Sequence, residues 1–100
     1  MKIFDLKKII THPYEERDRN VFYESERFKA RIIKLPAGGG MPTCQMKYYV
    51  VFYVMDGIAE VTVNNEKKTI SEGQCMVTGP ATLSLKTLGG VKIIGFQINE

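Results

Sequence analysis

Two sulfur-bearing side chains lie on the same face of one predicted strand. Cys44 and Met46 are two positions apart, and residues so spaced on a β-strand project from the same face. A thiolate and a thioether are soft ligands that suit Cu(I). Cysteine and methionine are also ordinary core fillers, and no third donor accompanies them. Two interpretations therefore stand, a soft-metal or thiol site at Cys44 and simple core packing.

Nucleophilic catalysis by Cys44 or by Ser84 would require a neighbouring general base. The chain has one histidine, His12, which precedes Pro13 in a polar stretch and is expected to be solvated or to fold over a barrel mouth. We assign no catalytic residue, and the sequence favours a non-enzymatic protein.

A basic stripe, Arg27, Lys29 and Arg31, alternates with apolar residues. Such a stripe is typical of a charged, solvated face that discourages pairing between sheet edges. An anion-binding patch is the alternative, although Glu24 and Glu26 lie close by in the sequence.

The elements that position these residues are predicted to be strands. Residues 1–10 fit either a short strand or one or two helical turns, and residues 11–20 read as a polar loop or arm. From residue 21 onward, short segments of period two are separated by Gly, Pro and Asn-Asn turns. This pattern predicts an all-β, antiparallel sandwich or barrel, with residues 1–20 as an N-terminal strand or arm and residues 21–100 as the barrel.

The stretch Met41–Gly57 is predicted to be a long strand that stops at a sharp turn, Asp56-Gly57. Residues 48–55 are apolar on both faces, which is typical of a strand covered on both sides. In a small barrel the second cover is most easily another subunit. We therefore expect a homodimer whose contact involves this strand and the apolar last strand, Val91–Ile98.

Composition sets broad limits. One hundred residues, 44% hydrophobic and 25% charged, are typical of one globular domain. A formal charge of +3 with interleaved signs gives no reason to expect nucleic acid or a membrane as partner. The first residues lack the apolar run of a signal peptide, and two cysteines are too few for a disulfide framework. We expect a cytoplasmic protein with free thiols.

The segment from Leu35 to Leu85 resembles the cupin family, and the resemblance extends over residues 30–98. The first cupin motif reads Gly, five residues, His-x-His, three or four residues, Glu, six residues, Gly. Gly38 and Gly57 occupy its outer glycines, whereas Cys44, Met46 and Val50 occupy the two histidine positions and the glutamate position.

The second cupin motif reads Gly, five residues, Pro-x-Gly, two residues, His, three residues, Asn. Gly73 matches its leading glycine, and Gly79 and Ala81 take the places of Pro and Gly. Ser84 then stands where the histidine is expected and Leu88 where the asparagine is expected.

The resemblance implies a single-domain jelly-roll barrel (a double-stranded β-helix) without the usual ligands for iron, manganese or zinc. We therefore expect no metal and no other cofactor, and none of the metal-dependent oxygenase, isomerase or decarboxylase activities common among cupins. The lumen is expected to be either filled by side chains or open to a small apolar or aromatic ligand. Its predicted lining is Cys44, Met46, Tyr48, Val50, Phe52, Met76, Thr78 and Ser84, with Cys75 on the outer face.

Three functions follow from these expectations. The first is a metal-free barrel that binds or senses a small molecule without catalysis, using Tyr48, Thr78 and Ser84 as polar contacts. The second is an enzyme with a soft-metal or thiol site at Cys44. The third is a structural or interaction dimer whose barrel is filled.

Overall fold

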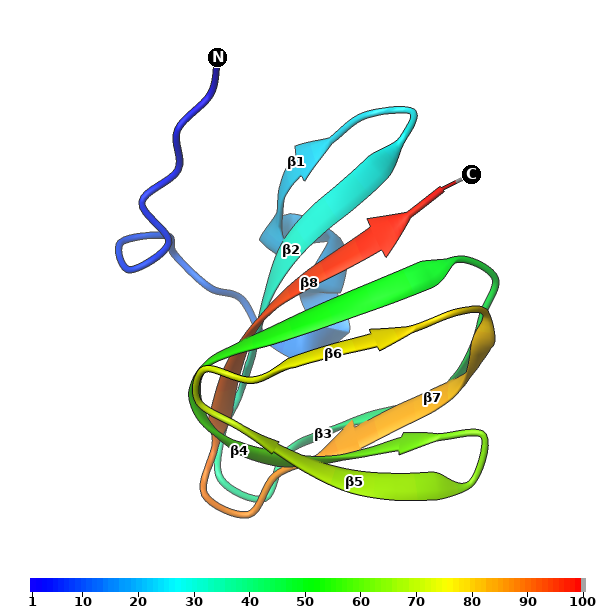
Figure 1. Cartoon of the computed structure of the whole chain (residues 1–100). Coiled ribbons are helices and arrows are strands. Elements are labelled where there is room, and N and C mark those ends of the chain that lie inside the picture. The colour runs from blue at the N-terminus through cyan, green and yellow to red at the C-terminus, as the bar shows by residue number, and fades with distance from the viewer. Residues whose placement is uncertain (100) are drawn as a thin grey trace.

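A computed structural model describes residues 1–99 and contains eight strands and one short 3-10 helix, η1 (Tyr14–Asn20). The predicted all-β class is confirmed, and the antiparallel strands curl into an open barrel (Figure 1). The strands are β1 (Val21–Glu24), β2 (Phe28–Leu35), β3 (Gly40–Met46), β4 (Tyr49–Val63), β5 (Glu66–Ser71), β6 (Cys75–Thr78), β7 (Ala81–Lys86) and β8 (Val91–Ile98).

β4 is the strand that the two halves of the barrel share. Residues 49–57 pair with β8, and within that stretch Val50–Tyr53 also pair with β6. The remainder of β4 pairs with β5 and β7 instead. The first sheet therefore contains β1, β2, β8, the first half of β4 and β6, whereas the second contains the other half of β4 with β5, β7 and β3.

Gly57 is where β4 passes from one sheet to the other, and here the sequence-based prediction was wrong. Asp56-Gly57 does not end the strand, because β4 continues to Val63. The pairing with β8 is irregular between Val54 and Asp56, and Gly57 has a φ of +89°. A β-carbon at Gly57 would overlap the carbonyl oxygen of Gly90. The dipeptide is therefore a bend within a strand, made possible by a residue without a side chain.

The predicted long strand is also interrupted at its other end. β3 ends at Met46 and β4 begins at Tyr49, so Lys47 and Tyr48 form a connection. The break is needed because β3 pairs with β7 in the second sheet, whereas the following residues pair in the first.

The hairpin turn at Asn64-Asn65 is confirmed. Both residues have positive φ values, 47° and 71°, and Val63 pairs directly with Glu66. Asparagine tolerates this backbone region better than most residues do.

The core lies between the two sheets and is apolar. Its members come from both halves of β4 and from β2, β5, β7 and β8, and they include Ile33, Val54, Val61, Leu83 and Ile93. None of these five is more than 4% exposed. The barrel is therefore filled along most of its length.

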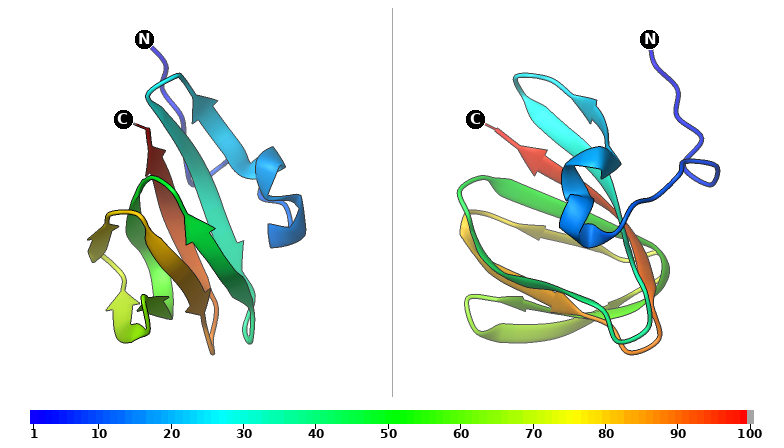
Figure 2. Two further views of the ribbon diagram at one scale, coloured as in Figure 1. Left: turned by 90° about the vertical axis from the view of Figure 1, so that its right-hand side faces the viewer. Right: turned by 180° about the vertical axis from the view of Figure 1, so that it is seen from behind.

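The N-terminal residues form neither a strand nor an α-helix. Residues 1–13 contain only a turn, and η1 replaces the loop predicted for residues 11–20. Phe4 packs edge-on against Phe22 at 5.0 Å between ring centroids, and Lys92 donates a hydrogen bond to the carbonyl oxygen of Leu6 at 3.0 Å. The segment therefore lies beside the first sheet, and Figure 2 shows η1 next to β2.

Within residues 1–99, no helix is long and apolar enough to cross a membrane.

Candidate functional site

A cavity of about 160 Å³ opens between the sheets beneath η1. Most of its lining is apolar, and the polar contributions come from two arginines, a tyrosine, a cysteine and a glutamine. The lining residues are Tyr14, Arg17, Arg31, Ile33, Met41, Cys44, Met46, Val50, Phe52, Leu83, Gly95, Phe96 and Gln97.

A row of three residues across the first sheet places a basic and an aromatic residue at the cavity. Gly95 on β8 is directly opposite Arg31 on β2 and Phe52 on β4, and directly opposite residues point to the same face. A β-carbon at Gly95 would come within 3.2 Å of Ile33 Cδ1 and of Phe52 Cε1. The Phe52 ring and the Ile33 methyl group therefore lie against the bare backbone of Gly95, in the space that a side chain would take.

η1 brings Tyr14 and Arg17 to the cavity. The Arg17 guanidinium carbon lies 5.4 Å from the centre of the Tyr14 ring, within the range of a cation–π contact. Tyr14 also packs against the core.

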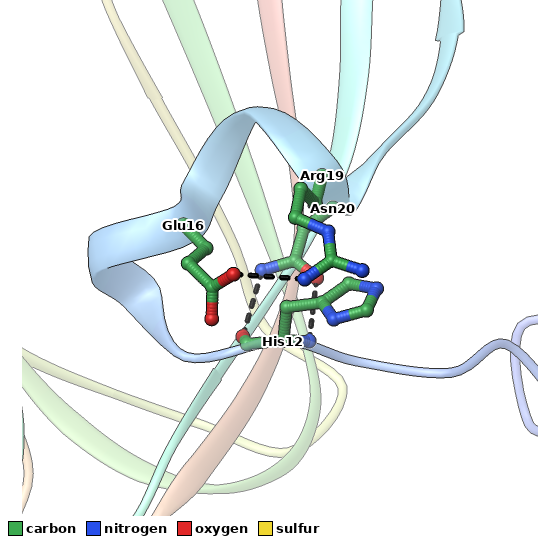
Figure 3. Close-up of polar contacts among 4 residues, drawn as sticks. All are labelled: His12, Glu16, Arg19 and Asn20. Carbon is green, nitrogen blue, oxygen red and sulfur yellow. Dashed lines mark hydrogen bonds and ion pairs between the residues drawn. The ribbon is translucent and has the colours of Figure 1, made fainter.

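Asn20, at the end of η1, holds this segment in place through a two-pronged contact with His12 (Figure 3). Its side-chain oxygen accepts a hydrogen bond from the His12 backbone N–H at 2.8 Å, and its side-chain amide donates one to the His12 carbonyl oxygen at 2.9 Å. Asn20 is only 5% exposed. Because its polar atoms are buried, both bonds are needed to offset the loss of water, and the segment that carries Tyr14 and Arg17 is fixed at both ends.

The cavity carries positive charge without a balancing acid. Among residues 1–99, no Asp or Glu lines it, and neither Arg17 nor Arg31 belongs to any of the ion pairs present there. By contrast, two other bases of the same part of the chain are paired with acids, since Lys29 lies 3.7 Å from Glu24 and Arg19 lies 2.8 Å from Glu16.

The structure brings half of the predicted lining residues to this cavity. Cys44, Met46, Val50 and Phe52 line it, and they come from β3 and from the first half of β4. Tyr48, Met76, Thr78 and Ser84 do not.

The prediction that Ser84 faces the lumen was wrong. Ala81, Leu83 and Leu85 of β7 are buried, whereas Thr82 and Ser84 are half-buried on the opposite face. Leu83 is directly opposite Cys44 and lines the cavity. The alternation of apolar residues sets which face turns inward, so the inward position beside Cys44 on the neighbouring strand is held by leucine.

The other three predicted lining residues that do not border this cavity lie elsewhere. Tyr48 is in the connection before β4 and is 40% exposed. Met76 and Thr78 are directly opposite Phe52 and Val50, as an inward face requires, but they border a second hollow of about 510 Å³ with residues of β5. Thr78 donates its hydroxyl hydrogen bond to the Gly79 carbonyl oxygen at 3.2 Å.

Of the polar groups of the cavity, Cys44 was predicted, whereas the two arginines, Tyr14 and Gln97 were not assigned to the lining. Arg31 was expected in a solvated stripe, with an anion-binding patch as the alternative, because Ala30 and Ile32 alternate with it. Both are buried, but they lie on the outer face of the first sheet, which is the face that Phe4 and Leu6 border. The burial of Ile33 and Leu35 on the opposite face shows that Arg31 faces inward, and the two consecutive isoleucines were the available signal.

The residues at the cupin ligand positions do not fit the usual metal. Cys44, Met46, Val50 and Leu83 supply one thiol and one thioether, and no imidazole or carboxylate. Iron and manganese in such sites prefer nitrogen and oxygen ligands. Among residues 1–99, no three His, Cys, Asp or Glu side chains lie close enough together to hold a metal ion.

Both cysteines are free, as expected from the sequence, and both are exposed. Exposure was expected of Cys75, whereas Cys44 was predicted to face the lumen or to fill the core. The Cys44 thiol lies 3.9 Å from the Gln45 carbonyl oxygen, a weak contact that does not activate it. Cys75 pairs with Tyr53 on the outer face of the first sheet.

Solved structures with a similar backbone include several cupins. The cupin domain of Schizosaccharomyces pombe Cnp3 has a TM-score of 0.73 and 23% identity, and the match covers 80% of this chain and 61% of that one. A cupin superfamily protein from Desulfitobacterium hafniense has a TM-score of 0.74 and 11% identity, with 80% and 74% covered. This chain therefore spans less than two thirds of the S. pombe chain.

An enzyme is also among the similar structures. Salicylate 1,2-dioxygenase from Pseudoaminobacter salicylatoxidans has a TM-score of 0.69 and 22% identity, and the match covers 72% of this chain and 20% of that one. No protein-family model and no curated protein matches the sequence. At these identities the similarity concerns the backbone arrangement alone.

Proposed function

Since the chain has the cupin fold but not the residues that hold a cupin metal, we propose that it binds a small, largely apolar molecule in the cavity beneath η1 without transforming it. The observation that carries this proposal is the cavity itself, about 160 Å³ with an apolar floor. Ile33, Val50, Phe52 and Leu83 form much of that floor.

The size of the cavity favours a ligand of one ring or a short chain. An apolar cavity of roughly 150 Å³ in another protein is large enough for benzene, and a single water needs only roughly a tenth of that volume. Drug-sized ligands occupy pockets of roughly 300–1,000 Å³. The volume of the cavity is therefore larger than that of a packing defect but too small for a bulky substrate.

The chemistry of the lining supports binding without catalysis. A nucleophile requires a base that removes its proton, and Cys44 and Tyr14 have no imidazole or carboxylate beside them in the lining. Leu83 replaces the third imidazole position of a cupin with an alkyl group. These residues can enclose a ligand and orient it.

Cavity occupancy is tested by blocking the entrance. Cys44 is exposed and lines the cavity, whereas its neighbour Gln45 is exposed on the opposite face of β3 and contacts Thr82. We expect neutral one-ring fragments such as benzyl alcohol to shift the methyl NMR signals of Ile33 and Leu83. Cys44→Phe should lower their affinity at least about tenfold by filling the space, and Gln45→Phe should leave it unchanged.

Two results would contradict the proposal. One is the absence of any fragment-induced shift at Ile33 and Leu83 at millimolar concentration. The other is equal binding by the wild type and Cys44→Phe, which would place the ligand elsewhere. The melting temperatures of both variants establish that each is folded.

A further inference from the structure

We infer that the ligand of this cavity is a monocarboxylic acid with one ring or a short chain, whose carboxylate is bound by Arg31 and Arg17 and whose apolar part lies against Phe52. This inference rests on the proposed function, because it specifies the chemical class that the same cavity would select.

The contrast between two bases on the same strand face supports an anionic ligand. Lys29 and Arg31 are two positions apart on β2, and both face inward. Lys29 is paired with Glu24 at 3.7 Å, whereas Arg31 has no carboxylate partner among residues 1–99 and lines the cavity. An anion is attracted more strongly by a half-buried guanidinium group beside an apolar surface than by an exposed one, because the surrounding medium screens the charge less than water does.

Arg17, an exposed residue of η1, adds a second positive charge to the lining. η1 places it over the Tyr14 ring, and the buried Asn20 contact fixes the segment from which it projects. Two guanidinium groups can donate several parallel hydrogen bonds to one carboxylate, a geometry that arginine favours over lysine. Gln97, half-buried in the same lining, supplies an amide that can donate a further hydrogen bond.

The volume of the cavity limits the size of the ligand. The Phe52 ring lies against the bare backbone of Gly95, and Arg31 and Phe52 both line the cavity. A single ring that bears one carboxylate suits a volume of about 160 Å³, whereas a second ring would exceed it.

A matched pair of ligands tests the charge. Benzoate and benzamide share a ring and a planar polar group but differ in charge. We expect wild-type protein to bind benzoate at least about tenfold more tightly than benzamide at pH 7, because hydrogen bonds between charged groups are stronger than neutral ones. Isothermal titration calorimetry measures both affinities.

Three arginine variants assign the effect to the cavity. Arg31→Gln should lower benzoate affinity about tenfold and leave benzamide affinity unchanged, and Arg31→Lys should give an intermediate loss because it keeps the charge without the planar geometry. Arg27→Gln removes an exposed arginine that does not line the cavity, so it should change neither. Arg31→Lys also keeps the test valid if Arg31→Gln is unstable.

The outcomes separate this inference from the proposed function. If benzamide binds as tightly as benzoate, or if benzoate affinity falls equally in Arg27→Gln and Arg31→Gln, the carboxylate assignment is overturned and an apolar binding site remains. If neither benzoate, benzamide nor benzyl alcohol binds, both the assignment and the proposed function fail.

Discussion

Cys44 and Met46 occupy positions that hold two imidazoles in the usual cupin motif, and here they form part of an apolar cavity wall. The identity of these side chains decides which metals the barrel can retain, because a thiol and a thioether offer no ligand of the kind that iron or manganese prefers. The consequence is measurable on the purified protein.

We expect protein purified without chelators or metal-leaching tags to contain less than one equivalent of iron, manganese, zinc or copper. Inductively coupled plasma mass spectrometry measures the content, and Cys44→Ser should not alter it. A full equivalent of one metal that disappears in Cys44→Ser would contradict the metal-free proposal and favour a soft-metal site at Cys44.

A second residue-scale prediction concerns the bend in β4. Gly57 and Gly73 have similar positive φ values, +89° and +84°, but a β-carbon would collide with backbone only at Gly57. We expect Gly73→Ala to lower the free energy of unfolding by about 1–2 kcal/mol, the cost of a left-handed residue. Gly57→Ala should lower it by at least about 3 kcal/mol, because steric overlap adds to that cost.

Urea denaturation of both variants measures the difference. If the two substitutions lower the free energy of unfolding by similar amounts, the backbone at Gly57 can move away from Gly90. The bend in β4 would then not depend on the close approach of these two residues.

At the level of elements, η1 shows how a short helix is fixed by its ends. Its own exposed ion pair, Glu16 with Arg19 at 2.8 Å, is accessible to water, whereas the Asn20 contact is buried. Exposed ion pairs contribute little to stability, so the buried amide carries most of the attachment.

We therefore expect Asn20→Ala to lower the free energy of unfolding by about 1–3 kcal/mol, since two hydrogen bonds are lost. The His12 amide should also exchange with deuterium faster. Arg19→Ala should cost less than about 1 kcal/mol and leave that exchange unchanged. Equal effects of the two substitutions would mean that η1 is not held through Asn20.

Sequence reasoning succeeded for elements whose signals are local. The Asn64-Asn65 turn could be read from neighbouring residues, and the first motif count placed Cys44, Met46 and Val50 together. It failed for Ser84, where a motif count was preferred to the local alternation of apolar residues. Ser84 was assigned inward by counting along a motif whose landmarks are absent here, although Leu83 and Leu85 indicated the opposite face.

The inward direction of Arg31 was hidden for a related reason. β2 is buried on both faces, since Ile32 lies on the outer face of the first sheet and Ile33 lies on the core side. A strand of this kind has no clear alternation, so its polar residues cannot be assigned to a face until its partners are known.

On the scale of the whole molecule, the outer face of the first sheet leaves large apolar side chains in water. Tyr49, Tyr53, Val77 and Ile98 are each at least 38% exposed, and Val77 reaches 65%. The pairs Tyr49–Ile98 and Val51–Val77 place them on one surface. Apolar surface of this kind is typical of an interaction site, and we propose that a second copy of the chain covers it.

We expect sedimentation equilibrium at micromolar concentration to give twice the chain mass of 11.3 kDa. Val77→Lys should shift the mass toward the monomer, because a buried, unpaired charge opposes association. Thr43→Lys, which adds the same charge at an exposed residue of β3, should remain dimeric. A wild-type mass near 11.3 kDa would contradict the dimer.

The position of β8 bears on how the chain is made. β8 follows the other seven strands in the chain, yet it lies between β2 and β4 and is the partner that joins them. Until residues 91–98 leave the ribosome, these two strands lack that partner, and their apolar faces and unpaired edges stay accessible. Pairing between such distant segments is intrinsically slow. During that interval the nascent chain exposes apolar surface that pairing with β8 later covers.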